Sequence, residues 1–174
     1  MRQFYETFST PLGDFSVALD ANGAVIATAF GGLAELRERF AADDVALDAK
    51  RTAAVRREIT EYFAGDRERF TVKLSPSGTP FQQSVWAALQ HIPFGATRSY
   101  GEIATELGNP GASRAVGRAN ATNPICLLIP CHRVIGAAGS LTGFAFGEDL
   151  KRRLLQHEAG AKSTAKIGVA LVAV

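Results

Sequence analysis

The 174-residue chain is poor in the residue types that mark secreted, metal-binding and membrane proteins. Two cysteines give no disulfide framework, so reduced thiols and a cytoplasmic location are expected. No Cys-x-x-Cys or His-x₃₋₅-His pair occurs, and we therefore expect neither a metal nor a cofactor. No signal-peptide-like run opens the sequence, and the longest apolar run, residues 167–174, is too short to cross a bilayer. No membrane partner is expected.

The charge is modest but unevenly distributed. Residues 1–78 hold 10 Lys+Arg and 12 Asp+Glu, a net of −2, whereas residues 79–174 hold 9 and 5, a net of +4. A basic C-terminal half is compatible with a polyanionic partner. Ordinary solvated surface explains the same charges, and composition alone favours that explanation.

The N-terminal half is typical of a small α/β unit. Apolar-rich stretches at 4–9, 14–19 and 24–30 are separated by the turn sequences TPLG and DANG, which predicts an antiparallel meander. Apolar residues recur at helical spacing over 33–40 and 55–63, and alternate over 70–74, where we expect one more strand. We interpret residues 1–74 as a supporting domain.

The C-terminal half is predicted to be mostly helical. After a short linker at 75–78, Thr79-Pro80-Phe81-Gln82 and Ser99-Tyr100-Gly101-Glu102 are capping-box starts of helices. A third helix at 112–121 follows a tight turn, which suggests a helix-turn-helix, and a last helix is expected over 148–158. The fold class is thus α/β (α+β), with domains 1–74 and 79–160 and a tail 161–174. In that tail we expect a polar tether at 162–166 and an added strand or disordered segment at 167–174.

The helix at 112–121 has an unusually bare surface. Arg114 and Arg118 are its only long side chains, whereas a major-groove helix is expected to carry several base-reading groups. A bare helix with an arginine can approach a minor groove and insert one side chain into the base stack. Tight helix packing also needs small residues, so both explanations stay open.

A thiol and an imidazole are adjacent at Cys131 and His132. An apolar run at 125–129 leads into Pro130, which cannot continue a strand ladder and therefore presents Cys131 at a bend. Glu158, on the last predicted helix, could fix the tautomer of His132, so a Cys-His-Glu relay is feasible. A buried structural cysteine beside an exposed histidine is the alternative.

These segments together resemble the C-terminal domain of O6-alkylguanine-DNA alkyltransferases (methylated-DNA–protein-cysteine methyltransferases). The resemblance covers residues 79–160, about half of the chain, and the motif PCHRV at 130–134 is its most specific part. The TPLG meander resembles the family's N-terminal domain more loosely. The other matching segments are TPFQ (79–82), VW (85–86), SYGE (99–102), RAVG (114–117), NP (123–124) and HE (157–158).

The resemblance implies a suicide transfer reaction. Cys131 would accept the alkyl group, His132 would draw its proton through a water molecule, and Glu158 would orient His132. Tyr100 would donate through its hydroxyl toward guanine N3. The S-alkyl product is not hydrolysed, so each molecule would react once.

The resemblance also implies how the substrate is held. The DNA contacts that it implies are Tyr100, Ala112, Ser113, Arg114, Ala115, Gly117 and Arg118. Arg114 would fill the gap left by a flipped nucleotide, and Asn123 would hold the turn before the cysteine segment. The carbonyls of Cys131 and Val134 would accept from the guanine amine, and the Ala145 amide would face O6. The partner would be double-stranded DNA containing O6-alkylguanine, bound by a protein that is monomeric in solution; cooperative binding along DNA stays open.

The sequence departs from the family pattern in the loop after the cysteine. Phe144-Ala145-Phe146-Gly147 stands where relatives often have Tyr-x-Gly-Gly, so the two phenylalanines would narrow or reshape the pocket. Cys126 replaces a proline common in some relatives and is interpreted as a buried apolar residue. The sequence leaves two alternative functions open: a helix-turn-helix protein with an inert cysteine that binds lesions or regulates, and a cysteine hydrolase that turns over.

Overall fold

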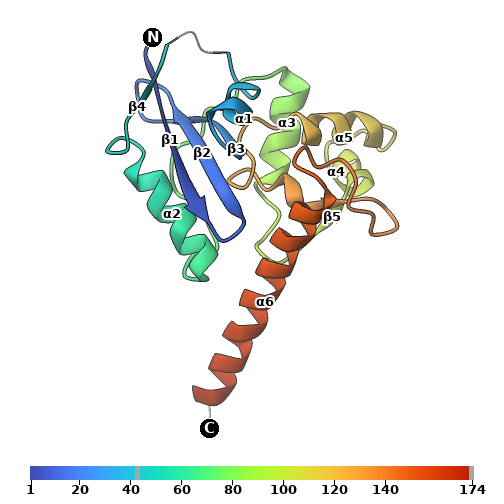
Figure 1. Cartoon of the computed structure of the whole chain (residues 1–174). Helices are drawn as coiled ribbons and strands as arrows, with labels where there is room; N and C mark the ends of the chain where they lie inside the picture. Colours follow the sequence, from blue (N-terminus) through green and yellow to red (C-terminus); the bar gives the residue numbers. More distant parts are fainter. Residues whose placement is uncertain (42–43, 173–174) are drawn as a thin grey trace.

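Three strands of the N-terminal half form the predicted antiparallel meander (Figure 1). They are β1 (Gln3–Thr10), β2 (Gly13–Leu19) and β3 (Val25–Phe30). The computed structural model describes the backbone of residues 1–41 and 44–172 and the side chains of residues 1–41 and 44–161. In the first turn Gly13 has a φ of 104°, which glycine adopts without strain. Strand β2 is buried on both faces from Phe15 onward, because helices cover the sheet on either side.

The fourth strand of this sheet is not the predicted one. It is β4 (Val45–Leu47), which pairs in parallel with β1 and gives the order β3-β2-β1-β4. The strand expected at 70–74 is wrong, since only Leu74 forms an isolated bridge, to Val25. The amide of Thr71 bonds instead to the buried Glu58 carboxylate at 2.8 Å. The alternation there reflects side chains that pack on the core, not a hydrogen-bonded ladder.

Two helices complete the N-terminal half, as the apolar spacing predicts. The short helix α1 (Leu33–Arg37) packs Leu36 against alanines of β2 and β3. Helix α2 (Ala53–Ala64) buries Val55, Ile59 and Tyr62, and Gly65 ends it with a φ of 83°. Tyr62 is fully buried, which places its hydroxyl deep in the molecule.

The C-terminal half begins with three helices, α3 (Pro80–Leu89), α4 (Tyr100–Glu106) and α5 (Ser113–Ala121). Both predicted capping boxes are present: Thr79 caps α3 with Gln82, and Ser99 caps α4 with Glu102. A two-stranded parallel pair, β5 (Arg98–Ser99) and β6 (Val134–Ile135), joins the start of α4 to the cysteine segment. The predicted α+β fold is confirmed.

The last helix is longer than predicted. Helix α6 (Glu148–Val172) extends away from the rest of the molecule (Figure 1). The tether at 162–166 and the strand or disordered segment at 167–172 are therefore wrong, because alanine and lysine favour a helix and no proline interrupts it. Residues 173–174 of that prediction lie outside the described residues. Among the described helices, none combines the length and apolar character that crossing a bilayer requires.

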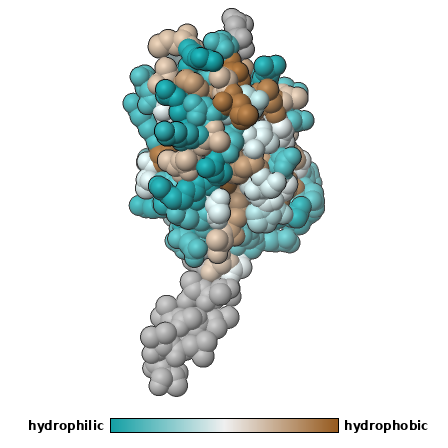
Figure 2. All heavy atoms as spheres, turned by 60° about the vertical axis from the view of Figure 1, so that its left-hand side comes forward, coloured by the Kyte–Doolittle hydropathy of each residue, from teal (hydrophilic) through white to brown (hydrophobic). Residues whose placement is uncertain are grey.

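The two halves share one apolar core. Phe15, Val25 and Ile59 belong to the same buried cluster as Leu89 and Ile129. Backbone bonding adds to this contact, since the amide of Thr28 in β3 donates to the Pro124 carbonyl at 2.9 Å and its hydroxyl to the Cys126 carbonyl at 2.8 Å. The face drawn in Figure 2 is mostly hydrophilic, with apolar residues interspersed. The division at residues 75–78 stays a prediction.

Candidate active site

The segment that carries Cys131 is buried and tightly turned. Residues 125–129 are almost completely buried, and Leu127 has a φ of 72°, a left-handed conformation that leucine rarely adopts. The amide of Leu128 bonds to the Cys126 carbonyl at 2.9 Å, which closes this turn. After Pro130 the chain forms one turn of 3-10 helix, η1 (Cys131–Arg133). Cys131 thus lies at a bend, as predicted, and 4% of the residue is exposed.

His132 and Glu158 meet as the sequence predicts. The distance from His132 Nε2 to Glu158 Oε1 is 2.7 Å, and both side chains are fully buried. The carboxylate requires a proton on Nε2, so Nδ1 of the neutral ring is an acceptor. Nδ1 is buried and has no hydrogen-bond partner in the described part of the chain. His132 therefore has one nitrogen anchored and the other free to take a proton.

Glu158 is the centre of a dense group of donors. Arg133 donates from Nε to both carboxylate oxygens and from Nη2 to Oε1 at 2.9 Å. The Tyr62 hydroxyl donates to Oε1 at 2.8 Å, and the Gly95 amide to Oε2 at 3.2 Å. Burial by itself raises the pKa of Glu158, but bonding and charge from His132 and Arg133 outweigh it and hold that pKa well below its ordinary value. Glu158 is therefore a carboxylate.

Burial sets the protonation of the reacting pair. It lowers the pKa of His132 despite the opposing effect of Glu158, so the ring is neutral at pH 7. It raises the pKa of the Cys131 thiol, opposed by a hydrogen bond from Asn123 and by the positive charge of Lys151. At rest the site holds a thiol, a neutral imidazole and a carboxylate. A base must act before Cys131 becomes a nucleophile.

Asn123 holds the turn that precedes the cysteine segment. Its Nδ2 donates to the Ile129 carbonyl at 2.9 Å, and its Oδ1 accepts from the Ile125 amide at 3.0 Å. Both bonds are buried and span the two ends of the apolar run. The side chain therefore fixes the path of the chain up to Pro130.

Tyr100 opens α4 and points toward the loop at 136–147. Its hydroxyl donates to the Thr142 carbonyl at 2.6 Å. Thr142 therefore accepts from the hydroxyl that, by the family resemblance, would donate to guanine N3. A side chain at Gly143 would collide with the same hydroxyl, and Gly143 has a φ of 82°. The loop and Tyr100 thus fit together only with glycine at this position.

The expected pocket residues lie around this loop. Val134 is buried in β6, and its amide donates to the Cys131 carbonyl, which also accepts from Asn120 Nδ2 at 3.2 Å. Ala145 is exposed and Phe144 is partly buried. Both phenylalanines pack: Phe146 lies 5.7 Å from Phe144 and 5.6 Å from Phe30, ring centre to ring centre. The Arg39 guanidinium lies 4.5 Å from the Phe146 ring centre, so the N-terminal half anchors this loop.

Helix α5 carries its two arginines on one exposed face. Arg114 and Arg118 are exposed and one turn apart. The Trp86 indole donates to the Ala119 carbonyl at 2.8 Å, and Gly117 lies against the Tyr100 ring. Small residues of α5 thus serve close packing on one side. The other expected contacts, Ala112, Ser113 and Ala115, are half-buried.

Local sequence reasoning missed four functional candidates. Tyr62 lies on α2, Asn120 on α5 and Lys151 on α6. Arg133 lies inside the PCHRV motif, yet nothing in the motif shows that it contacts Glu158. Buried charged or polar side chains gave no local signal, because their partners are distant in sequence.

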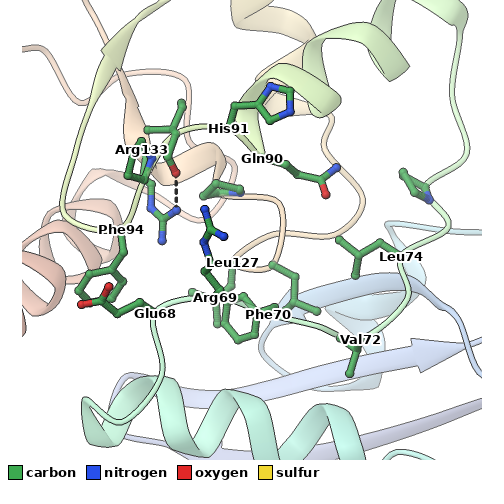
Figure 3. Close-up of a pocket in the computed structure, with 15 residues that line it drawn as sticks. Glu68, Arg69, Phe70, Val72, Leu74, Gln90, His91, Phe94, Leu127 and Arg133 are labelled. Carbon is green, nitrogen blue, oxygen red and sulfur yellow. Dashed lines mark hydrogen bonds between the residues drawn. The ribbon is translucent and has the colours of Figure 1, made fainter.

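Residues on both sides of Cys131 in the sequence, among them Leu127, Pro130 and Arg133, line the cleft in Figure 3. It measures about 620 Å³ and includes neither Cys131 nor Tyr100. Phe70 and Val72 line it, which explains their alternation without a strand. It shares Arg133 with the site, and the dashed line marks the bond from Arg133 to the Ile92 carbonyl, 2.8 Å. The cleft is therefore separate from Cys131 and Tyr100.

The protonation states predict how stability depends on pH. The pKa values of His132 and Glu158 are lowered in the folded state, so the unfolded chain binds protons at these groups more readily. The difference begins near the ordinary pKa of each group, about 6.5 for His132 and about 4.3 for Glu158. We expect the free energy of unfolding to fall as the pH drops through these values, as measured by urea denaturation. His132→Gln should flatten the slope between about pH 7 and pH 5, whereas His91→Gln, at an exposed site, should not. Equal slopes in all three proteins would contradict this assignment.

Comparisons with known proteins agree on one family. The model described as "6-O-methylguanine DNA methyltransferase, DNA binding domain" matches residues 80–160. A methylated-DNA–protein-cysteine methyltransferase of Methanosarcina acetivorans is 46% identical over 155 residues, which cover 89% of this chain and 97% of the relative. One from Mycobacterium tuberculosis strain H37Rv is 57% identical over 101 residues, 58% of this chain and 61% of the relative.

Solved structures give the same result. The chain is similar to Mycobacterium tuberculosis OGT in complex with DNA, with a TM-score of 0.82 and 41% identity over 91% of this chain and 94% of that one. It is also similar to O6-methylguanine-DNA methyltransferase from the archaeon Pyrococcus kodakaraensis, with a TM-score of 0.61 and 26% identity over 90% and 98% of the two chains.

Proposed function

Because the chain belongs to the methylated-DNA–protein-cysteine methyltransferase family, we propose that its own Cys131 accepts the alkyl group of O6-alkylguanine in duplex DNA. Family membership establishes an enzyme of DNA repair that transfers methyl groups to a protein cysteine. The observation that carries the proposal is the buried row of Cys131, neutral His132 and ionised Glu158. Transfer occurs once per molecule.

The reaction is a displacement at the alkyl carbon. His132 takes the thiol proton on Nδ1, through a water molecule, and the thiolate of Cys131 attacks the carbon. A carbon–sulfur bond forms while the carbon–O6 bond breaks, and its electron pair stays on guanine, which is neutralised by a proton donated from Tyr100. Glu158 stabilises the imidazolium that forms. The thioether product has no leaving group for water, so the protein is consumed.

Helices α4 and α5 are proposed to act as the DNA-binding helix-turn-helix. The small residues of α5 allow close approach to a minor groove, and Arg114 enters the stack as the damaged nucleotide rotates out. Arg118, Ala112, Ser113 and Ala115 contact the DNA backbone. The Tyr100 hydroxyl leaves the Thr142 carbonyl and donates to the flipped base instead. The protein does this as a monomer.

Intact-protein mass spectrometry tests the proposal. The protein is incubated with a duplex that contains one O6-methylguanine and is then mapped by peptide. We expect one added methyl group on Cys131 and one lesion repaired per protein molecule. Lesion binding without a change in protein mass would instead favour a reversible lesion-binding protein. Repeated turnover on an activated ester would favour a cysteine hydrolase.

Lys151 should raise the reactivity of Cys131. Its ammonium is buried, donates to the Thr142 carbonyl at 3.2 Å, and burial lowers its pKa to about 8. At pH 7 it is therefore still charged and favours the thiolate. Lys151→Met should slow alkylation of Cys131 by free O6-benzylguanine roughly tenfold at pH 7, the effect of one pKa unit in the thiol. Lys151→Arg keeps the charge and should lose less. A Met variant as fast as the parent would rule out this electrostatic role.

A further inference from the structure

A hydroxyl from the N-terminal half reaches into the row of reacting groups. Tyr62, on α2, donates to Glu158 Oε1 at 2.8 Å, and His132 Nε2 contacts the same oxygen at 2.7 Å. All three side chains are fully buried. The two donors therefore share one carboxylate oxygen, which also accepts from Arg133, away from solvent that could replace any of them.

The ring of Tyr62 is held from several sides. Phe63, Phe70 and Phe94 lie 5.1, 5.5 and 5.9 Å from it, centre to centre, and the His157 ring lies at 5.0 Å. His157 Nε2 also bonds to the Tyr62 carbonyl at 2.9 Å. These contacts leave the hydroxyl in one position. Packing of the ring sets the position of the oxygen, and its hydrogen turns toward Glu158.

A fixed donor has two effects on the carboxylate. The terminal torsion of a glutamate is soft, so donors of fixed direction decide how its oxygens point. Arg133 donates to both oxygens, and the Tyr62 hydroxyl and the Gly95 amide each add one bond, to Oε1 and to Oε2. A hydrogen bond also withdraws charge from Oε1 and weakens its hold on the His132 imidazolium. The other charged groups that act on this pair are Arg133 and Lys151.

We propose that Tyr62 is a positioning residue for alkyl transfer, which orients Glu158 toward His132 and limits the basicity of His132. This inference rests on the proposed function, since it concerns how Cys131 is activated. It gives the N-terminal half a part in the reaction, beyond the supporting role that the sequence predicts for residues 1–74.

The test is Tyr62→Phe, which keeps the ring and removes the hydroxyl. Second-order rate constants for transfer to Cys131 are measured across pH with free O6-benzylguanine and with duplex containing O6-methylguanine. We expect a loss of roughly tenfold on both substrates, as for other supporting hydrogen bonds. The acid limb of the pH profile, where the rate falls as His132 is protonated, should move to higher pH by roughly one unit. The reason is that Glu158 then holds a proton on His132 more strongly.

Tyr5→Phe is the matched control, the same change at a half-buried site on β1. It should alter neither the rate nor the acid limb. A Tyr62→Phe protein that matches the parent in both would overturn the proposal. A lower rate with an unmoved acid limb would show a merely structural role and would also overturn it.

A second variant covers the case in which Tyr62→Phe does not fold. Incorporation of 3,5-difluorotyrosine at position 62 keeps the hydroxyl and makes it a stronger donor. The acid limb should then move to lower pH, and the His132 pKa read by NMR should move with it. No shift would refute the role of Tyr62. A parent protein that gains no alkyl group would instead refute the proposed function, so the two failures are distinguishable.

Discussion

Glu158→Gln should lose both stability and alkyl transfer. The Arg133 guanidinium and its bonded partners are buried, and glutamine leaves that charge without a counter-charge. Removing one partner of a buried ion pair costs about 3–5 kcal/mol in the free energy of unfolding. The new amide group also presents hydrogens to donors such as Tyr62 and Gly95. Urea denaturation measures the stability, and single-turnover transfer from O6-methylguanine duplex should slow at least about 100-fold.

Asp149→Asn is the control on the same helix. Its carboxylate is exposed and lies 3.5 Å from Arg152, a surface pair worth about 0–1 kcal/mol. It should leave transfer unchanged. Glu158→Asp keeps the charge on a shorter stem and should fall between the parent and glutamine variants. A glutamine variant as stable and active as the parent would show that the carboxylate charge contributes nothing here.

Arg114→Ala should separate action on DNA from action on a free base. Arg114 is exposed on α5, so its loss leaves the fold intact. If Arg114 fills the gap left by the flipped nucleotide, its removal leaves the unstacking free energy of a few kcal/mol uncompensated. We expect repair of O6-methylguanine in duplex to slow about 100-fold. Reaction with free O6-benzylguanine, which needs no flipping, should stay within about twofold of the parent, as followed by protein mass.

Arg118→Ala provides the comparison one turn along the same helix. Because Arg118→Ala removes one contact to the DNA backbone, it should weaken duplex binding modestly. It should also lower the salt dependence of binding by the equivalent of about one phosphate contact. Arg118→Ala should not impair the rotation of the damaged nucleotide out of the duplex. Equal losses for Arg114→Ala on duplex and on the free base would refute the insertion of its side chain. Equal losses for the two arginine variants on duplex would make Arg114 an ordinary phosphate contact.

The parts of the fold that could be predicted are those whose cause is local. The capping boxes at Thr79 and Ser99 and the turn chemistry around Gly13 depend on residues a few positions apart. Strand β4 could not be found, because three residues give no period and the strand exists only through pairing with β1. Apolar alternation at 70–74 was misleading, since burial against the core and a strand ladder produce the same pattern.

The candidate site divides in the same way. Cys131 and His132 are neighbours in sequence, and Glu158 could be inferred because a carboxylate commonly orients such a histidine. Their distances were not available from the sequence. Tyr62 was out of reach, because its bond to Glu158 spans 96 positions and depends on how α2 packs against α6. Long-range polar contacts between buried side chains are specified by the whole fold.

The bonds from Thr28 to the cysteine segment also bear on synthesis of the chain. Strand β3 is at one edge of its sheet, and residue 28 pairs with residue 125, almost one hundred positions later. Leu74 covers only the Val25 end of this edge, so the part around Thr28 has no partner while the ribosome is still making the second half, and such edges pair with other chains. A nascent chain stopped near residue 74 is therefore expected to aggregate. The segment that carries the nucleophile is also the one that closes this edge as translation finishes.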